Sequence, residues 1–200
     1  MIFNKDHIYH IYNQGNNKGQ IFFTRENYLF FLHKIIVYIL PYSDILAWCL
    51  MPNHFHLMVY VTPDATDIDG VTPSHPVNRA PTFNSSIGIM LRSYTRAVNK
   101  QENRSGALFR EETKAICLDE IRGVAPNWLK SAGITYFNIR LPERVYPQVC
   151  FNYIHQNPVN AGLVNKPEEW EFSSYSDVIR FRAGKLINHA RITEFGLKAY

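Results

Sequence analysis

Residues 45–61 read ILAWCLMPNHFHLMVYV. Two runs rich in aliphatic and aromatic residues lie on either side of Met51-Pro52-Asn53, a short connection made of turn-forming residues. Such runs favour extended strands, and a connection this short joins strands that run antiparallel. We therefore expect a β-hairpin with strands at 45–50 and 54–61.

Further elements are expected on both sides of this hairpin. A strand is expected at residues 8–12, followed by a helix from Thr24, a suitable N-cap, to Leu40, because apolar residues recur there at helical spacing. After the hairpin, the same spacing predicts a helix over 86–101, and residues 112–118 predict a fourth strand. The order β-α-β-β-α-β predicts an α+β fold of the ferredoxin-like kind, an antiparallel sheet with helices packed on one face.

One more helix is expected after the fourth strand. Pro147 suits the first turn of a helix, where its missing N–H is not needed. We expect this helix to reach Asn157 and to end there, because Pro158 follows.

The domain organisation follows from length and composition. The chain has 200 residues, 46% of them hydrophobic, which is enough for one core. We expect one domain over residues 1–182 and a C-terminal tail over 183–200. Loop insertions are expected at 62–83, where prolines cluster, and at 119–141, with a short helix around 128–130.

Charge and cysteine content limit the class of protein only weakly. The net charge is +4 and the pI is near 8.9, which permits a polyanionic partner without requiring one. Cys49, Cys117 and Cys150 are odd in number and lack metal-finger spacing, which favours a reducing compartment. The most apolar stretch, residues 28–40, is too short to span a bilayer. We expect a soluble, cytoplasmic protein that does not enter a membrane.

A His-x-His motif lies in the second strand of the hairpin. Side chains alternate along a strand, so His54 and His56 point to one face and Phe55 to the other. Two imidazoles about 6–7 Å apart along a strand can converge on one divalent ion. An isolated His-x-His motif more often marks two histidines on a solvated sheet face, so the motif by itself does not establish a metal site.

A tyrosine and an amide share one face of the later helix. Tyr153 and Asn157 are four residues apart, one helical turn. An amide oxygen can complete a His-His-O site that suits Mg²⁺ or Mn²⁺, and a phenol beside such an ion gains nucleophilicity. Gln156 is an alternative source of the amide, and Tyr153 could instead extend the apolar stripe of its helix.

These residues together resemble those of a known family. The motif LMPNHFHL at 50–57 and the motif YIHQNPVNAGLV at 153–164 closely resemble those of the HUH single-tyrosine transposases, above all the REP-associated tyrosine transposases. Shorter stretches agree with this resemblance: YHIYNQG at 9–15, RSGALF at 104–109 and WEFSSY at 170–175. Because the two long motifs occur in the same order, the resemblance is specific.

The resemblance implies a nuclease domain whose C-terminal helix is the catalytic helix. It implies that His54 and His56 bind a divalent metal ion, Mg²⁺ or Mn²⁺, with Asn157 as the third ligand. It further implies that Tyr153 is the nucleophile, which cleaves and rejoins single-stranded, hairpin-containing DNA through a 5′-phosphotyrosine. The family includes dimers that exchange the tyrosine helix, so a homodimer is compatible with it.

Basic residues supply candidate contacts to a phosphate backbone. Arg92, Arg96 and Lys100 are spaced four apart on the helix predicted at 86–101. They form either a DNA-binding stripe or a solvated face of that helix. Arg110 and Lys114, beside the fourth strand, are further candidates for DNA binding.

Other residues of the same types have expected structural roles. Tyr94, the rival nucleophile, lies on the apolar stripe of its helix and is expected in the core. His155 is two residues beyond Tyr153 and is expected to point away from it. His10, in the first strand, could neighbour the metal site, and a packing role is expected for it.

Two other functions are compatible with the same residues. The chain could be a nucleic-acid-binding module of this fold without catalytic activity. It could also be a metal-dependent phosphodiesterase that forms no covalent intermediate.

Overall fold

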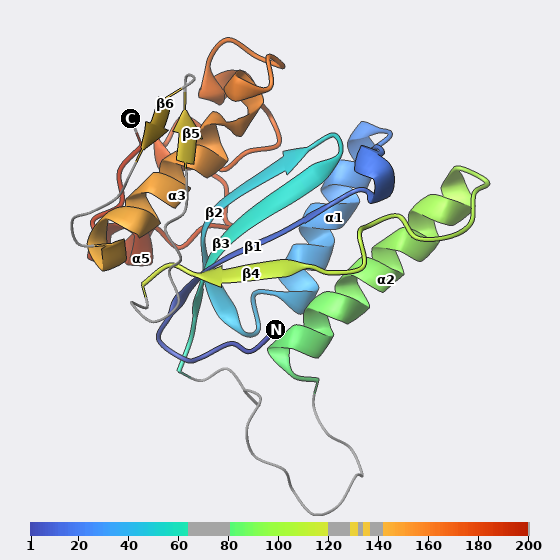
Figure 1. Ribbon diagram of the computed structural model, residues 1–200, viewed down its shortest axis with the longest axis horizontal. Helices are drawn as coiled ribbons and strands as arrows, with labels where there is room; N and C mark the ends of the chain where they lie inside the picture. The colour runs from blue at the N-terminus through green and yellow to red at the C-terminus, as the bar shows by residue number, and fades with distance from the viewer. Residues whose placement is uncertain (64–80, 120–128, 132–133, 137–141, 200) are drawn as a thin grey trace, which may run out of the picture.

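A four-stranded antiparallel sheet forms the centre of the computed structural model. The structure describes residues 1–63, 81–119, 129–131, 134–136 and 142–199. Of these, residues 129–131, 134–136 and 142–145 are described by their backbone alone. The strands of the sheet are β1 (Ile8–Gln14), β2 (Ser43–Met51), β3 (His54–Val61) and β4 (Lys114–Cys117). Their order is β2-β3-β1-β4 (Figure 1). This order, with an antiparallel partner for every strand, is ferredoxin-like, so the expected α+β fold is confirmed.

Helices cover both faces of this sheet. Helices α1 (Arg25–Tyr38) and α2 (Phe83–Gln101) contact each other on one side, and α3 (Pro142–Asn160) packs on β2 and β3 from the other side (Figure 1). The remaining elements are short: η1 (Asn16–Lys18), β5 (Leu129–Ser131), β6 (Ile134–Tyr136), η2 (Pro167–Glu169), α4 (Tyr175–Val178) and α5 (His189–Glu194). Helix α3 thus covers the sheet face opposite the one that α1 and α2 cover.

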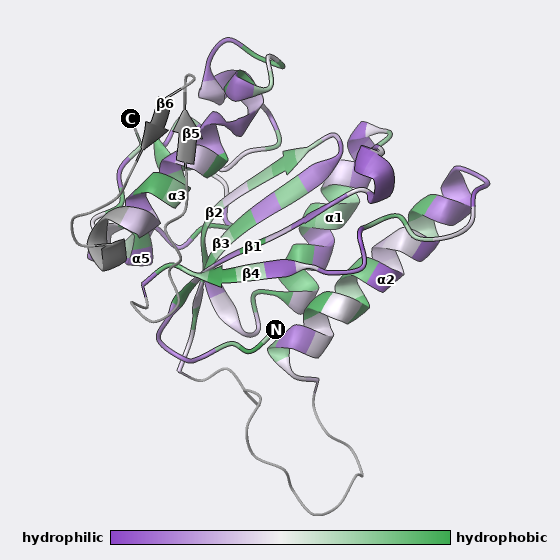
Figure 2. Cartoon of the chain, in the orientation of Figure 1, coloured by the Kyte–Doolittle hydropathy of each residue, from purple (hydrophilic) through white to green (hydrophobic). Residues whose placement is uncertain are grey.

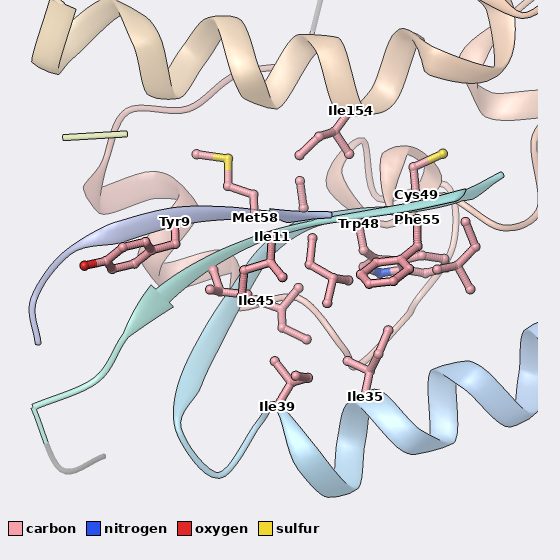
Figure 3. Close-up of a cluster of buried hydrophobic side chains, with 14 of the residues drawn as sticks. Tyr9, Ile11, Ile35, Ile39, Ile45, Trp48, Cys49, Phe55, Met58 and Ile154 are labelled. Atoms are coloured by element: carbon pink, nitrogen blue, oxygen red, sulfur yellow. The ribbon is translucent and has the colours of Figure 1, made fainter. Parts of the chain in front are cut away.

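The alternation of side chains along the strands divides the core into two layers. Ile11 and Ile45 point towards α1, whereas Met58 points towards α3 (Figure 3). Apolar residues follow the central strands, while α2 carries apolar and polar residues on different faces (Figure 2). The Phe55 ring, between the two histidines in sequence, lies on the α1 side, with its centroid 5.1 Å from that of Phe31. His54 and His56 therefore lie on the α3 side.

Helix α2 begins earlier than the apolar pattern predicts, at residue 83 instead of 86. Thr82 Oγ1 accepts a hydrogen bond from the backbone N–H of Ser85 at 3.1 Å, so the cap satisfies a free donor of the first turn. The buried ring of Phe83 anchors this additional turn in the core.

Helix α3 continues past Pro158, where we expected it to end, and reaches Asn160. Pro158 lacks one N–H as a proline does anywhere in a helix, but only two helical residues follow it, so a kink at this position displaces little of the helix. Gly162, with φ of 69°, ends the helix instead. Its N–H bonds to the Val159 carbonyl and the N–H of Leu163 to the Pro158 carbonyl, which together form a Schellman cap.

The C-terminal segments attach to the sheet rather than extending from it. Ile187 forms an isolated bridge with Ile45 of β2, and Ile187, Ile192 and Leu197 are buried.

The helix expected around 128–130 is replaced by β5, whose Leu129 pairs with Tyr136 of β6. Antiparallel pairing satisfies the backbone of so short a segment better than an isolated turn of helix does. Most residues of the insertions expected at 62–83 and 119–141 lie outside the described residues.

A buried hydrogen bond fixes α3 to β2. His155 Nε2 and Ser174 Oγ are 2.8 Å apart, and the backbone of Ser174 pairs with Trp48 of β2. His155 is 1% exposed, so it points into the protein and away from the face that carries Tyr153, as the sequence predicts. Burial lowers the pKa of His155 to about 3.

This burial predicts that the protein loses stability in acid. An unfolded chain binds a proton at His155 below about pH 6.5, whereas the folded protein does so only near pH 3. The stabilisation is therefore complete above pH 6.5 and is lost as the pH falls. Between about pH 7.5 and about pH 5, we expect His155 to account for a loss of about 2 kcal/mol in the free energy of unfolding.

Urea unfolding in EDTA at the two pH values measures this loss. The wild-type protein should lose about 2 kcal/mol more on acidification than the His155→Gln variant. His33→Gln, which changes an exposed histidine of α1, should retain the full pH dependence. Equal losses in the wild type and His155→Gln would contradict the assignment.

No helix in the described ranges combines the length and the apolar character needed to cross a bilayer.

Candidate active site

The fold brings the four residues of the two sequence motifs together. His54 and His56 lie on β3, and Tyr153 and Asn157 lie one turn apart on α3, above the same face of the sheet. The Tyr153 ring centroid is 5.3 Å from that of His56, and the centroids of the two histidines are 5.0 Å apart. His54 Nε2 lies 3.4 Å from Asn157 Oδ1. A phenol, an amide and two imidazoles thus meet between one strand and one helix.

Three of these side chains, those of His54, His56 and Tyr153, line a pocket of about 360 Å³. Tyr153 is 40% exposed, so its ring is accessible, whereas His56 is buried at 4%. The pocket is lined by Tyr12, Asn13, Gln14, His54, His56, Arg110, Glu112, Lys114 and Tyr153. A phosphate group in this pocket would therefore meet aromatic, amide, imidazole and cationic side chains and one carboxylate, that of Glu112, which forms an ion pair with Lys114.

Burial keeps the histidines of the site neutral. It is the main cause that lowers the pKa of His54, and it lowers the pKa of His56 well below 6.5, with further lowering by His10 and His54. Burial also lowers the pKa of His10 to about 4. Neutral imidazoles have a free lone pair, which is the form that binds metal ions.

The donor atoms fit a divalent cation. His54 Nδ1 lies 2.6 Å from Asn53 Oδ1, an acceptor, so the single proton of the neutral ring belongs on Nδ1. The Nε2 lone pair then faces Asn157 Oδ1. His56 Nε2 is buried and has no hydrogen-bond partner among the described residues. Two imidazole nitrogens and an amide oxygen are ligands that Mg²⁺ and Mn²⁺ accept, so this chain can hold such an ion.

Residues of β1 that the sequence did not assign to the site lie beside these donors. His10 Nε2 is 2.9 Å from His56 Nδ1, and Tyr12 stacks on His10 with centroids 4.8 Å apart. The expected packing role of His10 is thus accompanied by a polar contact. The signal in the sequence was the alternation of His10 and Tyr12 on one strand face, but the pairing of β1 with β3 was needed to interpret it.

The basic residues divide into three groups according to the pocket that they line. Arg110 and Lys114 line the same pocket as Tyr153. Arg92 and Arg96 of α2 line a second pocket of about 440 Å³, which shares Arg110 with the first. Lys100 is exposed and lines neither pocket. Of the five basic candidates, Arg110 and Lys114 are therefore the two that share a pocket with the tyrosine.

Tyr94 is remote from this chemistry. It is fully buried and donates a hydrogen bond to the Ile21 carbonyl at 2.8 Å, as its place on the apolar stripe predicts. Burial raises the pKa of the Tyr94 hydroxyl, which opposes ionisation. Of these two tyrosines, only Tyr153 is accessible.

A second group of metal-binding residue types lies at the other end of β1. His7 Nδ1 and Cys117 Sγ lie 3.2 and 3.3 Å from Asp119 Oδ1, and the three ligand atoms lie within 4.8 Å of one another. Asp119 Oδ1 also accepts a hydrogen bond from Ile8 N at 3.0 Å. The carboxylate joins the start of β1 to the end of β4, which accounts for these contacts without an ion.

Comparison with known proteins relates the fold to a solved structure. No protein-family model matches the chain, and no curated protein is significantly similar to it. The structure of the REP-associated tyrosine transposase bound to a REP hairpin is similar, with a TM-score of 0.58 and 17% sequence identity over 94% of this chain and 92% of that chain. The chain has a transposase-like fold. At this identity the likeness concerns the architecture of nearly the whole chain.

Proposed function

We propose that this protein is a transposase-like enzyme that cleaves and rejoins single-stranded, hairpin-containing DNA through a covalent phosphotyrosine. The observation that carries the proposal is the convergence of Tyr153, His54 and His56 at one pocket of a transposase-like fold, with Asn157 Oδ1 3.4 Å from His54 Nε2. The similar solved protein is bound to a REP hairpin, which supports a DNA substrate of this kind.

In the proposed reaction, the hydroxyl oxygen of Tyr153 attacks the phosphorus of a DNA phosphodiester. The bond from that oxygen to phosphorus forms, and the bond from phosphorus to the 3′ oxygen breaks. The phenol proton is released to solvent and the departing 3′ oxygen takes up a proton, so the products are a 5′-phosphotyrosine and a free 3′-hydroxyl. Attack by another 3′-hydroxyl reverses the step and joins a different end, without any need for ATP.

His54, His56 and Asn157 are proposed to hold a Mg²⁺ or Mn²⁺ ion. Such an ion supplies positive charge that polarises the phosphate and favours the phenolate. Arg110 and Lys114 are proposed to hold the flanking phosphates of the strand. A single strand suits this pocket, because the phosphate must reach a partly enclosed site and its bases must be free of a partner strand.

A denaturing gel tests the proposal directly. Wild-type protein is incubated with end-labelled hairpin DNA and Mn²⁺, in parallel with a sample containing EDTA. With the label at the 3′ end, which stays on the fragment joined to the tyrosine, a labelled protein–DNA adduct that survives SDS and is absent in EDTA is expected. Cleavage without an adduct would instead identify a metal-dependent phosphodiesterase. Neither product on the gel, with binding detected separately by fluorescence anisotropy, would identify a non-catalytic module.

Arg110 lines both pockets, so its removal is expected to weaken DNA binding more than the removal of a cation that lines neither. Arg110→Ala should weaken binding of hairpin DNA about 5- to 10-fold at about 0.1 M salt and reduce the salt dependence by roughly the share of one phosphate contact. Lys100→Ala is the matched control, since it removes an exposed cation that lines neither pocket. Fluorescence anisotropy across a salt series measures both values. Equal effects of the two substitutions would contradict this path for the DNA.

A further inference from the structure

His10 occupies a position in the sheet that only the strand pairing reveals. In the antiparallel register of β1 and β3, Tyr12 pairs with His56 and His10 pairs with Met58, so His10 is diagonal to His56 on the same face. His10 is 7% exposed, and its ring stacks on that of His56 with centroids 5.0 Å apart and an interplanar angle of 28°. Side chains from two strands thus hold each other in place beneath α3.

The contact between the two rings joins particular nitrogens. His10 Nε2 lies 2.9 Å from His56 Nδ1, a hydrogen bond in which one atom donates and the other accepts. If His10 donated, the single proton of a neutral His56 would lie on Nε2. That N–H would then be buried with no acceptor among the described residues, so the desolvation of the donor would not be offset by a hydrogen bond. If His56 donates from Nδ1, its Nε2 is a bare lone pair.

The neighbouring histidine shows the same arrangement with an acceptor of known identity. His54 Nδ1 contacts Asn53 Oδ1, which can only accept, so the Nε2 of His54 is free to face Asn157. His10 thus stands in relation to His56 as Asn53 stands to His54. Metal-binding histidines characteristically donate their second ring nitrogen to such a partner, which fixes the ring and its tautomer.

We propose that His10 is a positioning residue, which accepts a hydrogen bond from His56 Nδ1 and thereby holds the Nε2 lone pair of His56 towards Asn157, His54 and Tyr153. The benefit to metal binding rests on the proposed function, whereas the hydrogen bond between His10 and His56 rests on the pairing of β1 with β3. His10 itself is assigned no contact with substrate or metal, because its Nε2 is engaged by His56.

If His10 only filled space, the size of the side chain at residue 10 would matter and its hydrogen-bond acceptor would not. An apolar side chain of similar size would fill the space against Tyr12 and Tyr153, whose ring centroids lie 4.8 and 6.2 Å from that of His10. It would offer no acceptor to His56. Comparison of His10→Leu with His10→Gln separates the two roles, because the glutamine amide oxygen can reach the position of the imidazole Nε2.

The tautomer of His56, measured by NMR, decides whether His10 is a positioning residue. Metal-free protein labelled with ¹⁵N-histidine is studied by long-range ¹H–¹⁵N correlation NMR, and the His56 signals are identified by their loss in His56→Gln. We expect the Nδ1–H form of His56 in the wild type and in His10→Gln, and a shift towards the Nε2–H form in His10→Leu. A wild-type His56 in the Nε2–H form would overturn the proposal, whatever the behaviour of the two His10 variants.

Affinity for Mn²⁺ alone, measured by EPR titration, is the second readout. His10→Leu should bind about 10- to 100-fold more weakly than the wild type, and His10→Gln should recover to within about 3-fold of it. A Leu variant that binds as the wild type does, or a Gln variant as weak as Leu, would overturn the positioning role. If the wild type bound no Mn²⁺, the proposed metal site would fail, while the NMR result would still decide the role of His10.

Discussion

Replacing Tyr153 by Phe is expected to abolish the covalent protein–DNA adduct and to reduce strand cleavage by about 10³-fold or more. The change removes the attacking oxygen and leaves the ring, which is 40% exposed and contributes little to the core. Binding of hairpin DNA should remain within about 2-fold, because the basic residues of the pocket are unchanged. The adduct is measured on a denaturing gel and binding by fluorescence anisotropy.

Tyr94→Phe is the matched control for this result. It removes one hydroxyl from a tyrosine whose hydrogen bond to the Ile21 carbonyl is buried, at a cost of about 1 kcal/mol in stability. The adduct should form at the wild-type rate. Full activity in Tyr153→Phe, or loss of the adduct in Tyr94→Phe, would place the nucleophile elsewhere.

Replacing His54 or His56 by Ala is expected to weaken Mn²⁺ binding by more than about 100-fold, beyond the range expected for a residue that only supports a ligand. Each change deletes one of two imidazoles whose Nε2 atoms are available at the site. Cleavage should fall to the level of the wild type in EDTA. EPR titration measures the affinity, and the denaturing gel measures the cleavage.

The control for the histidines is His33→Ala, which removes an exposed imidazole on α1. It should leave both Mn²⁺ affinity and cleavage unchanged. Circular dichroism of each variant verifies that the sheet persists, since His56 is buried in it. If His54→Ala and His56→Ala retained wild-type affinity, the ion would have to be held by other donors.

The sequence was sufficient where the period of a strand or a helix decides the geometry. Alternation along a strand places His54 and His56 on one face and Phe55 on the other, and the turn of a helix places Tyr153 above Asn157. The order of the elements predicted the ferredoxin-like sheet, and the apolar stripe of α2 predicted the burial of Tyr94. Local geometry was misread where caps and pairing decide it, as at the ends of α2 and α3 and in β5.

By itself, then, the sequence determined which side chains share a face of a strand or a helix, because strands and helices have fixed periods. Only the tertiary structure decided which faces meet. The contacts of His54 with Asn157 and of His10 with His56 join residues 103 and 46 positions apart, through α3 packing on the sheet and β1 pairing with β3. No local period encodes such contacts; they arise because the free face of the sheet must be covered and each strand must find a hydrogen-bonding neighbour.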